Sequence, residues 1–176
     1  MWVMTFHALS ARILRRDIEK LGYKREFSIY DDDDQMTLIK RILKKLDISD
    51  KSYPPRAVKS VISDAKNHML SPEEWLKDNP DFRSKPYYRA YCEYEKELKE
   101  NNALDFDDLI LKTLELLTEH PPVLEVYRRK FSYIMVDEYQ DTNMAQYMLV
   151  RTLAGDKKNV CVVGDDDQSI YGWRGA

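Results

Sequence analysis

The sequence predicts an α/β fold that is predominantly helical, with parallel strands towards its carboxyl terminus and an all-helical region in its first half. Apolar runs at residues 131–136 and 160–163 predict two strands, and the stretch between them has helical spacing. A strand, a helix and a second strand within about thirty residues form a βαβ unit, whose strands are parallel. Residues 23–102 instead show helical spacing of their apolar positions from one helix-start signal to the next.

Composition and charge limit the classes of protein that fit. The 176 residues suffice for one domain or two small ones. The chain is 34% charged with a net charge of −3, so it has no global basic footprint and any nucleic-acid binding must come from local contacts. No apolar stretch approaches the roughly 18 residues of a membrane span, and the amino terminus lacks the organisation of a signal peptide. Cys92 and Cys161 have no CxxC partner and are expected in the core, so we expect a cytoplasmic protein without membrane contact.

The first segment, residues 1–22, is expected to end a strand at Trp2 and Val3 and then to form a helix that stops at Gly22. This helix carries a stripe of basic residues, and a solvated helix face explains the stripe better than a phosphate-binding surface does. Its entrance carries a hydroxyl and an imidazole that can cap exposed N–H groups or reach a phosphate. The entrance residues are Thr5, Phe6 and His7.

Helix-start signals divide the region from 23 to 102. The run Asp31–Asp34 precedes an apolar helical pattern, and the helix macrodipole explains these acids better than a metal site does. Pro54 and Pro55 begin another helix, and Ser71 with Glu74 forms a predicted capping box. An aromatic stripe follows at helical spacing and is expected in the core rather than as a base-stacking platform. The stripe consists of Tyr87, Tyr88, Tyr91 and Tyr94.

The segment from 103 to 155 is expected to hold three further helices. Asp105 is the predicted N-cap of the first helix, with Asp108 three residues later. Two prolines at 121–122 begin a short helix over 123–129. Asp141 or Thr142 is expected to cap the third helix, which ends at Gly155.

Two acids end the first apolar run. Asp137 and Glu138 follow a strand that is apolar on both faces, as expected for a strand buried in a parallel sheet. Open α/β sheets bind their ligands at the carboxyl ends of the strands. There, one carboxylate can hold Mg²⁺ while its neighbour orients or deprotonates water. The pair taken alone is equally compatible with the polar start of a loop. The second apolar run shows the same pattern of a strand followed by acids, because Gly164 and three acids come after it.

Three segments resemble sequence motifs of superfamily 1 DNA helicases of the UvrD/PcrA/Rep type. VDEYQDTN and GDDDQSIYGWRGA are similar to their motifs II and III, and MTFHAL at residues 4–9 is similar to motif Ib. DFDDL resembles the segment by which these enzymes return from an inserted subdomain. The resemblance implies a partial RecA-like domain of the P-loop NTPase type. Residues 1–22 and 103–176 would belong to this first motor domain, and residues 23–102 to the inserted helical subdomain.

The resemblance also implies roles for individual residues. Asp137 would hold the Mg²⁺ of Mg-ATP through water, Glu138 would act on the attacking water, and Gln168 would sense the γ-phosphate. Tyr171 and Trp173 would stack on unpaired bases. The remaining DNA-contact candidates are Arg174 beside them and Thr5, Phe6 and His7 in the motif Ib segment.

One element of the family's pattern is missing. The chain has five glycines and no G-x-x-x-x-G-K-S/T loop to cradle phosphates. We therefore expect an internal fragment, inactive in isolation, of a helicase that uses ATP to move 3′ to 5′ on single-stranded DNA and to unwind duplex at single-strand/duplex junctions. Two alternatives stay open: a helical DNA-binding module at 23–102 without catalysis of its own, and part of a helicase-nuclease subunit.

Overall fold

The computed structural model describes residues 1–157, 159–165 and 167. The chain is mostly helical, with two small parallel sheets, and it divides into two compact units. The first unit comprises Met1–Arg25 and Leu109–Ala176, and the second comprises Glu26–Asp108. Their assignment to a motor domain and an inserted subdomain stays a prediction. None of the helices among these residues is both long and apolar enough for a bilayer crossing.

The first unit begins with helix α1, which ends at Asp17, and the helical segment as a whole stops at Gly22 as predicted. Helix α1 is followed by a short 3-10 turn and by Gly22 in the left-handed conformation, with φ of 74°. The expected strand at Trp2 and Val3 is wrong, since both residues lie in irregular backbone. The helices and strands of this unit are α1 (Phe6–Asp17), α6 (Phe106–Glu119, which starts in the second unit), α7 (Pro121–Lys130), β3 (Ile134–Val136), α8 (Met144–Ala154) and β4 (Val160–Val162).

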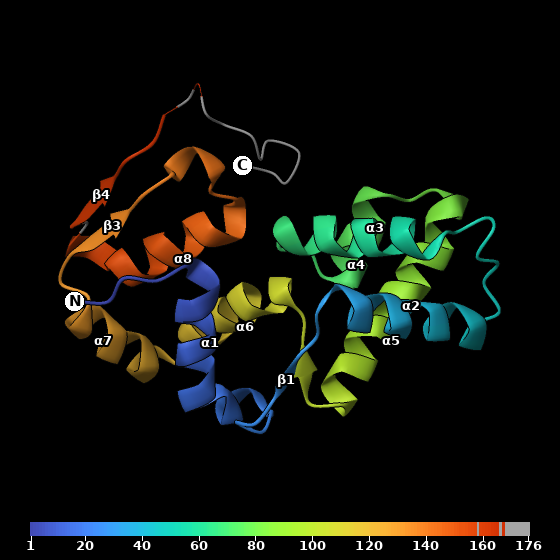
Figure 1. Cartoon of the computed structure of the whole chain (residues 1–176), viewed down its shortest axis with the longest axis horizontal. Helices are drawn as coiled ribbons and strands as arrows, with labels where there is room; N and C mark the ends of the chain where they lie inside the picture. Colours follow the sequence, from blue (N-terminus) through green and yellow to red (C-terminus); the bar gives the residue numbers. More distant parts are fainter. Residues whose placement is uncertain (158, 166, 168–176) are drawn as a thin grey trace. The chain divides into compact units, whose positions relative to one another are not determined.

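Strands β3 and β4 pair in parallel, as the βαβ pattern predicted (Figure 1). Ile134 lies opposite Val160, and Val136 opposite Val162. The prediction that this strand is buried on both faces is wrong, because Met135 is 75% exposed while Val136 is 6% exposed. Among the described residues, β3 has one neighbouring strand and only one face of the pair is covered.

Two further expectations about the first unit need correction. Asn143, rather than Asp141 or Thr142, caps α8: its Oδ1 accepts from the N–H of Gln146 at 2.9 Å, and Gln146 Oε1 accepts from the N–H of Asn143 at 3.1 Å. Asp141 is unsuited to the cap because it already belongs to the 3-10 turn Tyr139–Asp141. Gly155 ends α8 as predicted. The cysteines are not core residues: Cys161 is exposed, on the uncovered face of the sheet, and Cys92 is half-buried.

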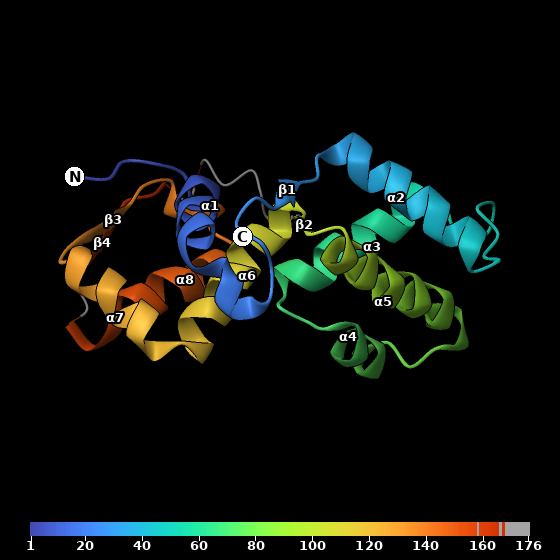
Figure 2. The same ribbon diagram turned by 90° about the horizontal axis from the view of Figure 1, so that it is seen from below.

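The second unit contains four helices and, contrary to the all-helical expectation, a parallel pair of very short strands (Figure 2). Ser28 lies opposite Ala103, and Ile29 lies opposite Leu104. Two residues are too few to show the alternation that marks a strand in a sequence. The elements of this unit are β1 (Ser28–Ile29), α2 (Asp32–Lys45), α3 (Pro55–Asn67), α4 (Pro72–Asp78), α5 (Lys85–Glu100) and β2 (Ala103–Leu104).

The capping box predicted from Ser71 and Glu74 is confirmed, and a second box, which was not predicted, lies at the start of α2. Asp31 Oδ1 accepts from the N–H of Asp34 at 2.9 Å at the start of α2. At the start of α4, Ser71 Oγ accepts from the N–H of Glu74 at 3.3 Å, and the Glu74 carboxylate accepts from the N–H of Ser71 at 2.9 Å. Each box satisfies N–H groups that the helix leaves without partners.

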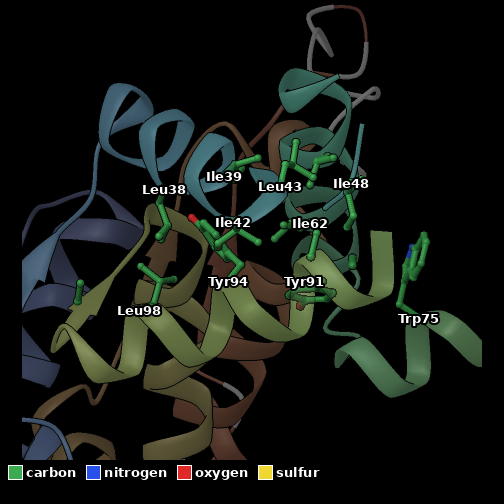
Figure 3. Close-up of a cluster of buried hydrophobic side chains, with 14 residues drawn as sticks. Leu38, Ile39, Ile42, Leu43, Ile48, Ile62, Trp75, Tyr91, Tyr94 and Leu98 are labelled. Atoms are coloured by element: carbon green, nitrogen blue, oxygen red, sulfur yellow. The ribbon is translucent and has the colours of Figure 1, made fainter. Parts of the chain in front are cut away.

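The core of the second unit lies between α2, α3 and α5, where Ile42, Ile62 and Tyr94 meet (Figure 3). The aromatic stripe belongs to this core as predicted: Tyr91 and Tyr94 are buried in it, and the other two tyrosines are partly buried and pack against the core.

A buried lysine of α3 holds the start of α6. Lys66 is 1% exposed, and its Nζ lies 2.8 Å from Asp105 Oδ2, 2.7 Å from Asp108 Oδ1 and 2.7 Å from Glu95 Oε1. Burial alone would lower the pKa of Lys66, but the three carboxylates raise it well above its usual value. Burial and the neighbouring charge of Asp105 raise the pKa of Asp108. The predicted N-cap is confirmed here too, since Asp105 Oδ1 accepts from the N–H of Asp108 at 2.8 Å.

Candidate active site

The carboxyl ends of β3 and β4 meet at one edge of the small sheet. Beyond the strands themselves, the N–H of Val163 donates to the carbonyl of Val136 at 2.8 Å, and the N–H of Tyr139 donates to the carbonyl of Val163 at 2.9 Å. The parallel pairing therefore continues into the residues that carry the acids. Asp137 and Glu138 follow β3 at this edge, where α/β sheets bind ligands.

The backbone turns sharply at the two acids. Glu138 has φ of 52°, a left-handed conformation that residues with a side chain adopt at a cost. Its N–H donates to Asp137 Oδ1 at 3.0 Å, and its carbonyl accepts from the N–H of Asp141 at 3.0 Å. Both carboxylates are exposed. This turn presents two neighbouring carboxylates to solvent at a fixed point of the backbone.

Gln140 lies between the two acids and the segment after β4. Its Nε2 donates to Glu138 Oε2 at 2.6 Å, and its Oε1 accepts from the N–H of Asp165 at 3.0 Å. A Cβ added to Gly164 would lie 2.6 Å from Gln140 Oε1, closer than a side chain tolerates. Sequence reasoning missed Gln140, and the only signal for it was its place in the same polar turn, two residues after Glu138.

The donor set at this edge suits magnesium held by few protein atoms. Mg²⁺ in phosphate-transfer sites is bound by one or two carboxylates together with water and substrate phosphates. Asp137 offers such a carboxylate, since the bond from the N–H of Glu138 uses its Oδ1 and leaves its Oδ2 for a further ligand. No group of three or more His, Cys, Asp or Glu side chains among the residues described forms a ready-made metal cage.

The residues predicted to contact DNA near the amino terminus lie at the start of α1. Thr5 is its N-cap, and Thr5 Oγ1 accepts from the N–H of Ala8 at 3.2 Å. Thr5 is exposed, whereas Phe6 and His7 are half-buried. The capping bond leaves the hydroxyl proton of Thr5 free to be donated. A DNA contact by these three residues stays a prediction.

Part of the basic stripe on α1 has a structural role. The guanidinium of Arg12 lies 3.9 Å from the ring centroid of Trp2, and Lys130 Nζ lies 4.1 Å from the same ring. These cation–π contacts join α1 to the end of α7 through Trp2. The expectation that the rest of the stripe is a solvated face stays a prediction.

The remaining predicted site residues, Gln168, Tyr171, Trp173 and Arg174, lie outside the described residues. A separate cavity of about 220 Å³ lies at the opposite, amino-terminal edge of the sheet, where Ser132 and Asn159 line it. Neither Asp137 nor Glu138 lines this cavity, so it is distinct from the site that the two carboxylates form.

Comparison with known proteins identifies the family. Residues 1–176 match the UvrD/REP helicase N-terminal domain. The chain belongs to this helicase family. It is 52% identical over 175 residues to the ATP-dependent DNA helicase PcrA of Bacillus subtilis, a match that covers 99% of this chain and 24% of that protein. The PcrA helicases of Staphylococcus epidermidis and Staphylococcus aureus are 51% and 50% identical over the same shares of each chain.

Family membership confirms the resemblance inferred from the three motifs. The chain spans about a quarter of the length of the curated relatives it matches. Those relatives are named as DNA helicases that depend on ATP.

Proposed function

We propose that this chain is part of an ATP-dependent DNA helicase that couples hydrolysis of Mg-ATP to 3′-to-5′ movement along single-stranded DNA and to duplex unwinding. One observation carries the proposal: Asp137 and Glu138 lie together at the carboxyl edge of the parallel pair β3 and β4, beside the segment that follows β4. The named activity of the relatives supports it, as does the fit of the Asp137 carboxylate to a magnesium ion that also binds phosphates.

In the proposed mechanism each of the two acids has its own task. Asp137 would hold the magnesium ion through water, and Glu138 would accept a proton from the water that attacks the γ-phosphate. A magnesium ion bound there would neutralise charge on the phosphates. The turn at Glu138 orients the Asp137 carboxylate relative to the backbone of Glu138, because Asp137 Oδ1 accepts from the N–H of Glu138.

The proposed DNA contacts rest on the resemblance of two segments to helicase motifs Ib and III, and residue chemistry is compatible with them. Bases stack on aromatic side chains with about 1–3 kcal/mol per base and little sequence preference, as a translocating enzyme requires. Gln168 links the γ-phosphate to this track in the proposal, and the substrate is single-stranded DNA and its junctions with duplex. The contact residues in the proposal are Thr5, Phe6, His7, Tyr171, Trp173 and Arg174.

We expect the 176-residue chain alone not to hydrolyse ATP, because it contains no G-x-x-x-x-G-K-S/T loop. The proposed setting is cytoplasmic, with ATP and Mg²⁺ as cofactors in the full-length protein. No feature of the residues that the structure covers favours a non-catalytic helical DNA-binding module over this proposal.

The test is Glu138→Gln in the full-length protein. Loss of the base is expected to reduce DNA-stimulated turnover at least a hundredfold, whereas ATP affinity, measured with a fluorescent analogue, changes by less than about threefold because the phosphate and magnesium contacts persist. Glu119→Gln, a change at an exposed carboxylate at the end of α6, is the matched control and should leave turnover unchanged. Normal turnover in the Glu138→Gln variant would contradict the assigned role.

A further inference from the structure

We propose that Gln140 is a positioning residue that holds the Glu138 carboxylate in place and links it to the segment after β4. The inference rests on the proposed function, since it concerns the residue that would activate water. Gln140 is also the one side chain that the hydrogen bonds of the described residues place between Glu138 and Asp165.

The first half of the link fixes the carboxylate. Glu138 is exposed, and an exposed glutamate samples several rotamers. The bond from Gln140 Nε2 to Glu138 Oε2, at 2.6 Å, is shortened by the charge of its acceptor and selects one orientation. It occupies one carboxylate oxygen and leaves the other to accept a proton from water. The left-handed backbone conformation of Glu138 sets the direction in which its side chain leaves the backbone, and the bond from Gln140 sets the position of its carboxylate.

The second half of the link holds the segment after β4. Gln140 Oε1 accepts from the N–H of Asp165 at 3.0 Å. Gly164 makes this approach possible, because an added Cβ would lie 2.6 Å from Oε1 and 3.2 Å from the Gln140 backbone nitrogen. Glycine at position 164 therefore leaves the space that the side-chain amide of Gln140 occupies.

A single planar amide makes both contacts, so they depend on each other. If the backbone at Asp165 shifts, the amide of Gln140 must rotate or move, and the bond to Glu138 changes with it. Placement of the proposed base thus becomes sensitive to the position of the segment that follows β4. The amide of Gln140 combines a donor for Glu138 with an acceptor for Asp165.

Two substitutions in the full-length protein separate the halves of the link. Gln140→Leu removes both contacts, and Gln140→Glu keeps an acceptor for Asp165 but replaces the donor to Glu138 by a like charge. Both variants should lose about ten- to a hundredfold in kcat with the KM for ATP within about twofold, as expected for a lost hydrogen bond to a charged group. Hydrogen exchange at the Asp165 amide should accelerate in Gln140→Leu and stay slow in Gln140→Glu.

Gln146→Leu is the matched control. It removes the capping contact with Asn143 at the start of α8, in the same loop, without touching Glu138. We expect it to lower stability and leave kcat unchanged. Normal kcat in Gln140→Leu beside an inactive Glu138→Gln variant would overturn the positioning role alone. Unchanged exchange at Asp165 in Gln140→Leu would overturn the link itself, and active Glu138→Gln enzyme would instead contradict the proposed function.

Discussion

Replacing the buried lysine of α3 tests how much the ionic cluster stabilises the second unit. Lys66→Met keeps the length of the side chain and removes its charge, leaving Asp105 and Asp108, each 3% exposed, without a cation. Removal of one partner from a buried ion pair costs about 3–5 kcal/mol of unfolding free energy. We expect a value of about 3 kcal/mol, because burial already raises the pKa of Asp108, and its carboxyl group can take up a proton.

The pH dependence of this loss has a defined sign. A buried carboxyl whose folded pKa is raised contributes stability below its unfolded pKa, and this contribution is lost as the pH rises through the folded pKa. The loss in Lys66→Met should therefore be larger at pH 8 than at pH 5, because Asp108 remains protonated more readily at the lower pH.

The assay is urea denaturation followed through Trp75, which is 8% exposed in the core of the second unit. A Trp2→Phe, Trp173→Phe background leaves Trp75 as the only tryptophan, since the chain has three. Lys96→Met is the matched control, because its ion pairs at 3.8 and 3.9 Å are exposed and worth less than about 1 kcal/mol. A loss below about 1 kcal/mol in Lys66→Met, or one equal to the control, would refute the reasoning.

Two further changes test single contacts. Burial alone would raise the pKa of Glu97, but hydrogen bonds from Arg41 and Lys45 lower it in the folded protein. The Glu97 carboxylate therefore contributes to the free energy of unfolding above its unfolded-state pKa, and this contribution is lost as the pH falls through its folded-state pKa. The unfolding free energies of the wild type and Glu97→Gln, measured in urea, should differ by about 1 kcal/mol at pH 7 and converge towards pH 3, whereas a constant difference would contradict the assignment. Gly164→Ala should displace the Gln140 amide, lowering kcat as Gln140→Leu does while changing stability by less than about 1 kcal/mol; unchanged kcat and Asp165 amide exchange would show that the contact is not needed.

Local chemistry explains which elements could be predicted from the sequence. The starts of α4 and α6 depend on side chains three residues apart, so Ser71 and Asp105 could be recognised as caps without knowledge of the fold. At the start of α2 the helix macrodipole was predicted to favour the run of acids, but the capping role of Asp31 was missed. The acids after β3 were recognisable for a similar reason, because the apolar run and the carboxylates are adjacent in the chain.

Features that depend on distant segments could not be predicted. The pairing of β1 with β2 joins residues from opposite ends of the second unit, and neither dipeptide has a pattern of its own. Burial of Lys66 contradicts the usual exposure of lysine, although the spacing from Ile62 placed it on the apolar side of α3. The position of Gln140 could not be predicted because it depends on a hydrogen bond with Asp165, which is distant in the sequence and lies across the edge of the sheet.

The short pairing of β1 with β2 brings the two ends of the second unit side by side, about 5 Å apart as in any sheet. A segment that leaves and returns at one point can be lengthened, shortened or exchanged without moving the residues on either side of it, provided that here the replacement keeps a cation for Asp105 and Asp108 as Lys66 does. The entropic cost of closing such a loop grows only slowly with its length, so the same pair of two-residue strands can close inserted segments of very different length. The pair is therefore a suitable junction for chimaeras. A chimaera that exchanges the segment between Tyr30 and Asn102 would retain the backbone hydrogen bonds from Ser28 to Asn102 and from Tyr30 to Leu104.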